Sequence, residues 1–281
     1  MSLDLLTQPS LFPLYSALSY YVLVFTVGQI ARKLVGKYVS DSTYKLFLIE
    51  FIGTVQMCTC VYENGIIVKN YGLKAFFLVV GLLQTAAGVF NQGAITNCVP
   101  VFEEFYFNKI SSNKLLTLVS AQLIGASLAS TVAYAIWNAT AQYSLAHSEV
   151  AAITICILPY KLGLSATIAY EIIGAFVCRA VIFKLAKSPS TRRVIPFWIA
   201  LYLAAAIYVV GVPGLNPIVA NARMYGCQGV DNQSFFFLYW VCPVIGWMAA
   251  ALLLRSEVPE KKNSASSTPK KQSITKKAKK A

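Results

Sequence analysis

Asn97-Cys98-Val99-Pro100-Val101-Phe102 and Asn216-Pro217-Ile218-Val219-Ala220 each open a short apolar stretch. Each stretch runs for about ten residues, which is half of what a membrane-crossing helix needs. An asparagine before the first turn, with a proline inside it, is a typical helix start. We therefore predict two half-helices that enter a membrane without crossing it. Interrupted helices in corresponding halves of a membrane protein are typical of a binding or conduction site.

Longer apolar runs surround these two stretches. Of the 281 residues, 57% are hydrophobic and 12% are charged, against a charged share of about 25% in soluble domains. Seven runs are long enough to span a membrane: residues 14–35, 44–62, 73–93, 114–137, 165–187, 194–212 and 235–254. We expect an all-α membrane protein with loops at 63–72, 138–163 and 213–234. Because the run 14–35 lacks a basic leader and a cleavage site, we expect a retained extra N-terminal helix.

Most of the basic residues lie on one side of the predicted membrane. Nineteen of the 24 Lys and Arg residues lie between spans one and two, three and four, or five and six, or in the tail. Alternating spans place all these segments on the same side, which the positive-inside rule makes the cytosol. We therefore expect the lipid bilayer as a partner, no nucleic acid as a partner, and a cytosolic C-terminus. The sequons at Asn138 and Asn232 fall on the opposite side, and the sequence does not decide whether they are glycosylated.

The two halves of the chain repeat one another. Residues 50–54 (EFIGT) match residues 171–175 (EIIGA) at a lag of 121, and Asn97 matches Asn216 at a lag of 119. A third match, Gly125 with Gly246, again has a lag of 121. An odd number of spans lies within the lag, so the repeats are inverted in the membrane.

These motifs, in this order, resemble the aquaporin (major intrinsic protein) family over residues 44–254. The first box is degenerate, an extra hydrophobic segment precedes the repeats, and Cys227 follows Asn216 by eleven positions. Together with the run 237–243 (FLYWVCP), these features resemble the superaquaporin branch of aquaporin-11 type. The resemblance implies an inverted repeat of helices with two re-entrant half-helices. We expect a helix and linker at 1–43, a channel domain at 44–254 (repeats 44–137 and 165–254), and a disordered basic tail at 255–281.

The resemblance implies a pore where the half-helices meet, with their positive dipole ends repelling cations. The asparagine boxes lining it would be Asn97, Cys98, Val99, Asn216, Pro217 and Ile218. The spacing carries the family's narrow filter over to Phe77, Ala204, Pro213 and Val219. Water-selective members place a histidine in this filter and orthodox members an arginine; here the only histidine, His147, lies in a loop, and Val219 replaces the arginine. Arg223, one turn later, is either a displaced substitute or a residue of the lumenal loop. We expect a wider, less polar filter that passes water, glycerol and hydrogen peroxide.

Several residues are expected to support this pore. Glu50 and Glu171 are intramembrane carboxylates, which are costly unless hydrogen-bonded, so we expect each to accept backbone hydrogen bonds from a pore loop. Close helix crossings are expected at four glycines: Gly53, Gly125, Gly174 and Gly246. Cys227 is either a small buried hydrophobe or a functional thiol. Glu103 and Glu104 either face the cytosolic vestibule or are solvated.

The sequence offers no catalytic residues, no cofactor motif and no metal site. Passive diffusion of water and small neutral solutes is therefore the expected activity, and the resemblance implies a homotetramer. A non-conducting structural or adhesion protein of the same fold is the alternative; a seven-helix receptor would explain neither the lag nor the half-helices. The final residues 277–281 (KAKKA) match a dilysine retrieval signal through Lys277 and Lys279, which predicts residence in the endoplasmic reticulum or another intracellular membrane.

Overall fold

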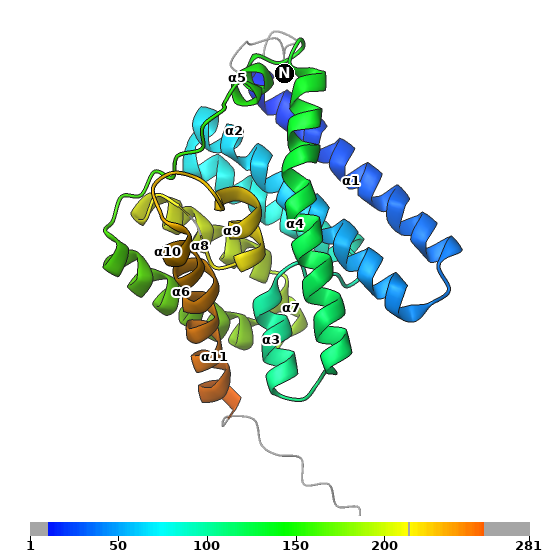
Figure 1. Ribbon diagram of the computed structural model, residues 1–281, viewed down its shortest axis with the longest axis vertical. Helices are drawn as coiled ribbons and strands as arrows, with labels where there is room; N and C mark the ends of the chain where they lie inside the picture. The colour runs from blue at the N-terminus through cyan, green and yellow to red at the C-terminus, as the bar shows by residue number, and fades with distance from the viewer. Residues whose placement is uncertain (1–10, 213, 256–281) are drawn as a thin grey trace, which may run out of the picture.

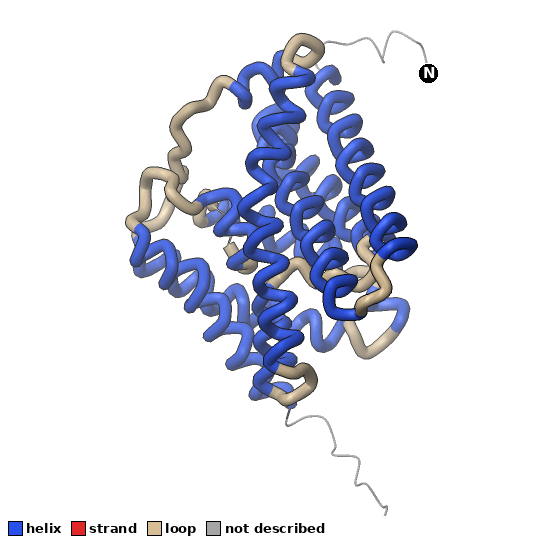
Figure 2. Tube along the Cα trace, turned by 45° about the vertical axis from the view of Figure 1, so that its right-hand side comes forward, coloured by secondary structure: helices blue, strands red, loops and turns tan. Residues whose placement is uncertain are grey.

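The computed structural model describes residues 11–212 and 214–255, and this part of the chain is a bundle of helices without strands (Figures 1 and 2). The tail and its dilysine match lie outside the described residues, as does Pro213. The expected all-α fold is confirmed. The helices are α1 (Phe12–Tyr38), α2 (Ser42–Phe90), α3 (Cys98–Tyr106), α4 (Ser112–Thr140), α5 (Leu145–Ala151), α6 (Leu164–Leu185), α7 (Pro189–Arg192), α8 (Ile195–Val209), α9 (Pro217–Met224), α10 (Asn232–Phe236) and α11 (Cys242–Arg255), with a π-helical segment (Phe237–Val241) before α11.

Five helical segments of the described chain are long and apolar enough to cross a membrane: α1, α2, α4, α6 and residues 232–254. The shorter α8 is also apolar. The 49 residues of α2 cover two expected spans, and the loop expected at 63–72 is wrong. Residues 63–71 are helical and Glu63, Asn64, Ile66 and Ile67 are buried, so the polar pair does not mark a loop. Only Gly72 leaves helical conformation, at a φ of 72° that glycine adopts without steric cost.

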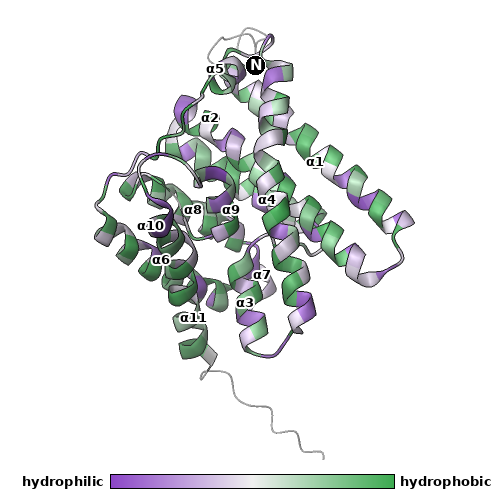
Figure 3. Ribbon diagram, viewed as in Figure 1, coloured by the Kyte–Doolittle hydropathy of each residue, from purple (hydrophilic) through white to green (hydrophobic). Residues whose placement is uncertain are grey.

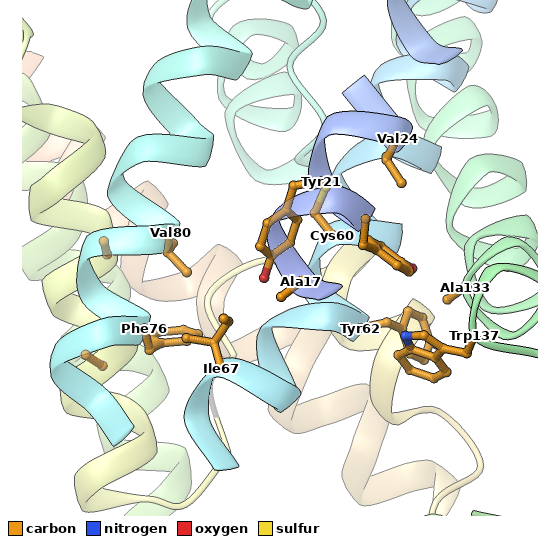
Figure 4. Close-up of a cluster of buried hydrophobic side chains, with 13 residues drawn as sticks. Ala17, Tyr21, Val24, Cys60, Tyr62, Ile67, Phe76, Val80, Ala133 and Trp137 are labelled. Atoms are coloured by element: carbon orange, nitrogen blue, oxygen red, sulfur yellow. The ribbon is translucent and has the colours of Figure 1, made fainter. Parts of the chain in front are cut away.

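The extra helix α1 is part of the core. Its residues Ala17, Tyr21 and Val24 pack with the parts of α2 before and after Gly72 and with α4, where Trp137 is buried (Figure 4). Tyr21 also donates a hydrogen bond to Asn64 of α2. Buried aromatic and aliphatic side chains stabilise such a contact by excluding solvent and by dispersion. The helix α1 is therefore packed on the bundle, not merely tethered to it.

The outer faces of the helices are apolar. Val22 and Val27 of α1, Leu82 of α2, Leu116 of α4 and Ile173 of α6 are all more than half exposed. Figure 3 shows that hydrophobic residues predominate along the long helices, with hydrophilic residues between them. A soluble protein rarely exposes such continuous apolar surface. These faces therefore suit contact with lipid chains.

The π-helical segment has a local cause in Pro243. Proline has no N–H to donate, and its ring clashes with the carbonyl four residues earlier, here that of Tyr239. A wider π turn over residues 237–241 accommodates this clash, and α11 begins at the residue before the proline. The last span therefore continues through residues 232–254.

Candidate functional site

Both predicted half-helices are present, and an asparagine caps each of them. The Asn97 Oδ1 atom accepts a hydrogen bond from Val99 N at 3.0 Å at the start of α3. The Asn216 Oδ1 atom accepts one from Ile218 N, also at 3.0 Å, at the start of α9. With the oxygen used as the cap, the amide nitrogen of each asparagine is the part that can donate to another molecule.

The two caps meet in the middle of the bundle. The Asn216 Nδ2 atom donates to the Thr96 carbonyl oxygen at 3.0 Å, so the N-termini of α3 and α9 lie against each other (Figure 1). Around them Cys98, Val99 and Ile218 are fully buried, whereas both asparagines are half-buried. The site therefore combines apolar walls with two amides and two positive dipole ends.

The residue before each asparagine has an unusual backbone conformation. Thr96 has a φ of 55° and Leu215 a φ of 69°, in a region that β-branched and bulky residues rarely enter. Such strain costs about 1–3 kcal/mol per residue and persists only where neighbouring groups hold it. The same strain at corresponding positions of the two repeats indicates that both pore loops are held in one required shape.

Glu50 holds the first loop. Its carboxylate is 1% exposed and accepts Ile95 N at 2.9 Å, Thr96 N at 2.6 Å and Gln122 Nε2 at 2.7 Å. Hydrogen bonds to a charged acceptor are the stronger kind. The carboxylate therefore compensates its own burial and fixes the strained Thr96 at the same time.

Glu171 holds the second loop less completely. Its Oε2 atom accepts Leu215 N at 2.9 Å, but its buried Oε1 atom has no partner. The repeat explains this difference, because the position that corresponds to Gln122 is Pro243, which carries no side-chain donor. Glu50 and Glu171 therefore occupy corresponding positions of the two repeats, but Glu50 accepts more hydrogen bonds than Glu171 does.

The four expected glycines lie at close approaches of helices and loops. A Cβ on Gly53 would lie 2.7 Å from that of Ala94 in the first loop, and one on Gly125 would lie 3.0 Å from Phe51 O. A Cβ on Gly174 would overlap the Tyr202 hydroxyl, and one on Gly246 would overlap the Ile172 carbonyl. These contacts bring the spans of each repeat together without a side chain between them.

The predicted filter residues occupy two apolar clusters. Phe77 and Ala204 belong to the cluster between α2 and α8, where the Phe77 and Phe197 rings lie 5.9 Å apart. Val219 packs in the cluster around the half-helices. The guanidinium of Arg223 lies 5.1 Å above the ring of Tyr62, whose hydroxyl donates to the Ala222 carbonyl. Arg223 therefore anchors the end of α9 to α2.

His147 is buried beside Glu63 of α2. Its Nε2 atom lies 3.2 Å from Glu63 Oε1 and its Nδ1 atom 2.7 Å from Thr140 Oγ1. Trp137 Nε1 donates to the other Glu63 oxygen at 2.7 Å. The predicted loops 63–72 and 138–163 contain Glu63 and His147, but in the structure the two side chains are buried together and join α5 to α2.

Cys227 is not a free thiol, because it forms a disulfide with Cys156. The bond joins the segment before α6 to the end of α9, and Gln228 N donates to the Cys156 carbonyl beside it. Both cysteines lie in loops predicted to face the lumenal side, and that shared location is the signal that could have predicted the pair. Disulfides persist in oxidising compartments, which agrees with that orientation.

Glu103, which the sequence left open, is an anchor for α3. Arg179 of α6 donates to both its carboxylate oxygens at 2.7 and 2.6 Å, and Trp247 Nε1 of α11 donates at 2.6 Å. This bidentate geometry is the strong form of the ion pair. The first half-helix is therefore fixed to the second repeat. Among residues 11–212 and 214–255, no group of three or more His, Cys, Asp or Glu could hold a metal.

Comparisons with known proteins agree with this geometry. A family model described as "Major intrinsic protein" matches residues 71–254. The chain is 58% identical over 253 residues to a Caenorhabditis elegans protein named "Putative aquaporin-10", covering 90% of each chain. It is 23% identical over 242 residues to "Aquaporin-11" of Milnesium tardigradum, covering 84% of this chain and 86% of that one. An X-ray structure of the aquaglyceroporin from Plasmodium falciparum superposes with a TM-score of 0.60 at 17% identity, covering 76% of this chain and 96% of that one.

Proposed function

This chain belongs to the major intrinsic protein (aquaporin) family, and we propose that it is a passive channel for water and small neutral solutes. Its relatives named aquaporin-10, -11 and -12 are of the superaquaporin type. The observation that carries the proposal is the meeting of two asparagine-capped half-helices inside a bundle of membrane-spanning helices. Members of the family are channels, not enzymes.

In the proposed mechanism a neutral solute passes the two asparagine amides in single file. Each amide offers N–H donors that replace part of the hydration of the solute. The side chains packed around the asparagines, Val99 and Ile218 among them, are apolar and offer no competing hydrogen-bond partner. A cation would meet the positive ends of both half-helix dipoles and be repelled, which is the electrostatic barrier used by channels of this kind.

The proposed filter consists of Phe77, Ala204, Pro213 and Val219. Without a histidine or arginine it has fewer hydrogen-bond donors than a strict water filter, so glycerol and hydrogen peroxide are proposed to pass along with water. These solutes share a small size, no net charge and oxygen atoms that accept hydrogen bonds from the asparagine amides. The proposed location is an intracellular membrane, with the C-terminus in the cytosol and four chains in the assembly.

A non-conducting structural protein is the second candidate, and one contact favours it. The Asn216 amide is already bonded to Thr96 O, so the junction between the half-helices is occupied by the chain itself. In the channel, a solute would have to compete for this donor. The Asn216 Nδ2 atom also lies 3.9 Å from the Met57 sulfur, a weak acceptor that a solute oxygen would have to replace.

Stopped-flow light scattering of proteoliposomes distinguishes the two candidates. Vesicles with the purified chain are mixed with an impermeant osmolyte to measure water flux or with glycerol to measure glycerol flux. Entry of hydrogen peroxide is followed with a dye enclosed in the vesicles. The channel predicts uptake above that of protein-free vesicles for at least one solute, with a lower activation energy. Rates equal to those of empty vesicles for all three solutes favour the structural protein.

A further inference from the structure

A buried arginine on the extra helix lies beside the first pore loop. Arg32 belongs to α1 and is fully buried, although its position predicted a cation of the cytosolic linker. Its NH2 atom donates to Gln56 Oε1 of α2 at 2.8 Å, and its Nε atom lies 3.3 Å from Gln29 Oε1. Its NH1 atom is buried without a partner. Arg32 precedes residues 71–254, the part that the family model matches.

Arg32 forms no ion pair within the described residues. The ion pairs formed there are Lys69 with Glu149 and Arg179 with Glu103, and Glu63 lies beside the His147 ring. The acceptors around Arg32 are the neutral amides of Gln29 and Gln56. Since arginine keeps its proton in proteins, a full positive charge lies inside the bundle, where charges are rare and commonly functional.

A short chain of contacts connects this charge with the pore loop. Gln56 Nε2 donates to Asn91 Oδ1 at 3.0 Å, and Asn91 opens the loop that leads to Asn97. One turn before Gln56, Gly53 packs against this loop, and one turn earlier Glu50 binds its N–H groups. The loop therefore runs along one face of α2, and Arg32 lies directly behind Gln56 on that face.

Gly28 allows this arrangement. It lies one turn before Arg32, and a Cβ there would come within 2.6 Å of Gln56 Oε1. The absence of a side chain lets α1 approach α2 closely enough for the guanidinium to reach the glutamine. Glycine and arginine together make the contact specific to this face of α1.

We infer that Arg32 is a charge-selectivity residue of the channel, supplying from the extra helix a positive potential that excludes cations at the first pore loop. The inference rests on the proposed channel function. The loop at 91–97 contains no charged side chain and Val219 is apolar, so the potential there comes from Glu50, Arg32 and the half-helix dipoles. Buried charges act over longer distances than solvated ones because salt and water screen them weakly.

Gln56 variants separate the charge of Arg32 from the positioning of the loop. Gln56→Glu gives the guanidinium a counter-ion and cancels its field, while Gln56→Met does not; both remove the N–H group that donates to Asn91 Oδ1. In proteoliposomes under a potassium diffusion potential, we expect Gln56→Glu to raise the proton and sodium leak about tenfold. Gln56→Met and Arg32→Lys, which keep the positive charge, should stay within about twofold of the wild type.

The same vesicles report neutral-solute flux, which tests the proposed function separately. A wild-type chain without such flux contradicts the channel. Gln56→Glu with wild-type flux and wild-type leak contradicts the role of Arg32, as does an equal rise of the leak in Gln56→Glu and Gln56→Met. Should Gln56→Glu not elute as a folded species, Arg32→Met replaces it, with the same expected leak and the same contradicting result.

Discussion

Replacing Glu50 by glutamine tests how the first pore loop is held. The carboxylate accepts three hydrogen bonds, from Ile95 N, Thr96 N and Gln122 Nε2. A glutamine can accept the two bonds at Oε1 with its oxygen, but its –NH₂ group then faces the Ile95 N–H. The variant therefore converts two charge-assisted bonds to neutral ones and leaves a third donor without an acceptor.

The expected loss follows from these three changes. A bond to a charged group contributes about 1.5–3 kcal/mol and a neutral one about 0.5–1.5 kcal/mol, so each converted bond loses about 1 kcal/mol. The unsatisfied N–H costs a further 1–3 kcal/mol or so. We expect Glu50→Gln to lower the unfolding free energy by about 3–5 kcal/mol and to reduce solute flux, because Thr96 is released from its strained conformation.

Glu171→Gln is the matched control. Its –NH₂ group can occupy the position of Oε1, which accepts no hydrogen bond, and its oxygen can keep the bond to Leu215 N. The expected loss is therefore only about 1 kcal/mol. Denaturant unfolding in detergent, followed by tryptophan fluorescence, compares the two variants. Equal losses for Glu50→Gln and Glu171→Gln would refute the reasoning.

Two further predictions concern the frame around the pore. Cys227→Ser removes a disulfide between residues 71 positions apart, so we expect the unfolding free energy to fall by about 4 kcal/mol. Alkylation of the unfolded wild-type protein should label two more cysteines after reduction than before. Equal labelling would contradict the bond between Cys156 and Cys227. Gly246→Ala places a methyl group against the Ile172 carbonyl and should destabilise the fold by about 1–3 kcal/mol through overpacking. The control Gly36→Ala, with nothing within 4 Å of the new Cβ, should stabilise α1 slightly. Denaturation midpoints compare the two variants, and a Gly246→Ala midpoint at or above the wild-type value would contradict the close helix crossing.

The sequence predicts the parts of this structure that repeat. The half-helices, their asparagine caps and the two glutamates share one lag, and the lag follows from the inverted arrangement. The helical continuation through residues 63–71 was missed because Glu63 and Asn64 are polar, and only tertiary contacts with Tyr21 and His147 show that they are buried.

Other features could not be predicted because they depend on distant partners. The disulfide and the Glu103–Arg179 pair join segments more than 70 residues apart, and nothing in the local pattern names the partner. The sequence assigns Arg32 to the cations between spans one and two, because hydropathy alone places it at the end of a span. Its burial depends on Gly28 and Gln56, which bring α1 against α2.

The central claim is that solutes pass the asparagine caps of the two half-helices. Asn216→Asp tests it most directly, because the carboxylate keeps the cap on Ile218 N but replaces the donor amide with a negative acceptor. Asn113→Asp, at an exposed position of α4, is the control for charge alone. In stopped-flow proteoliposome assays, the account predicts flux that is lost in Asn216→Asp and unchanged in Asn113→Asp. Flux in Asn216→Asp equal to that of the wild type would contradict it.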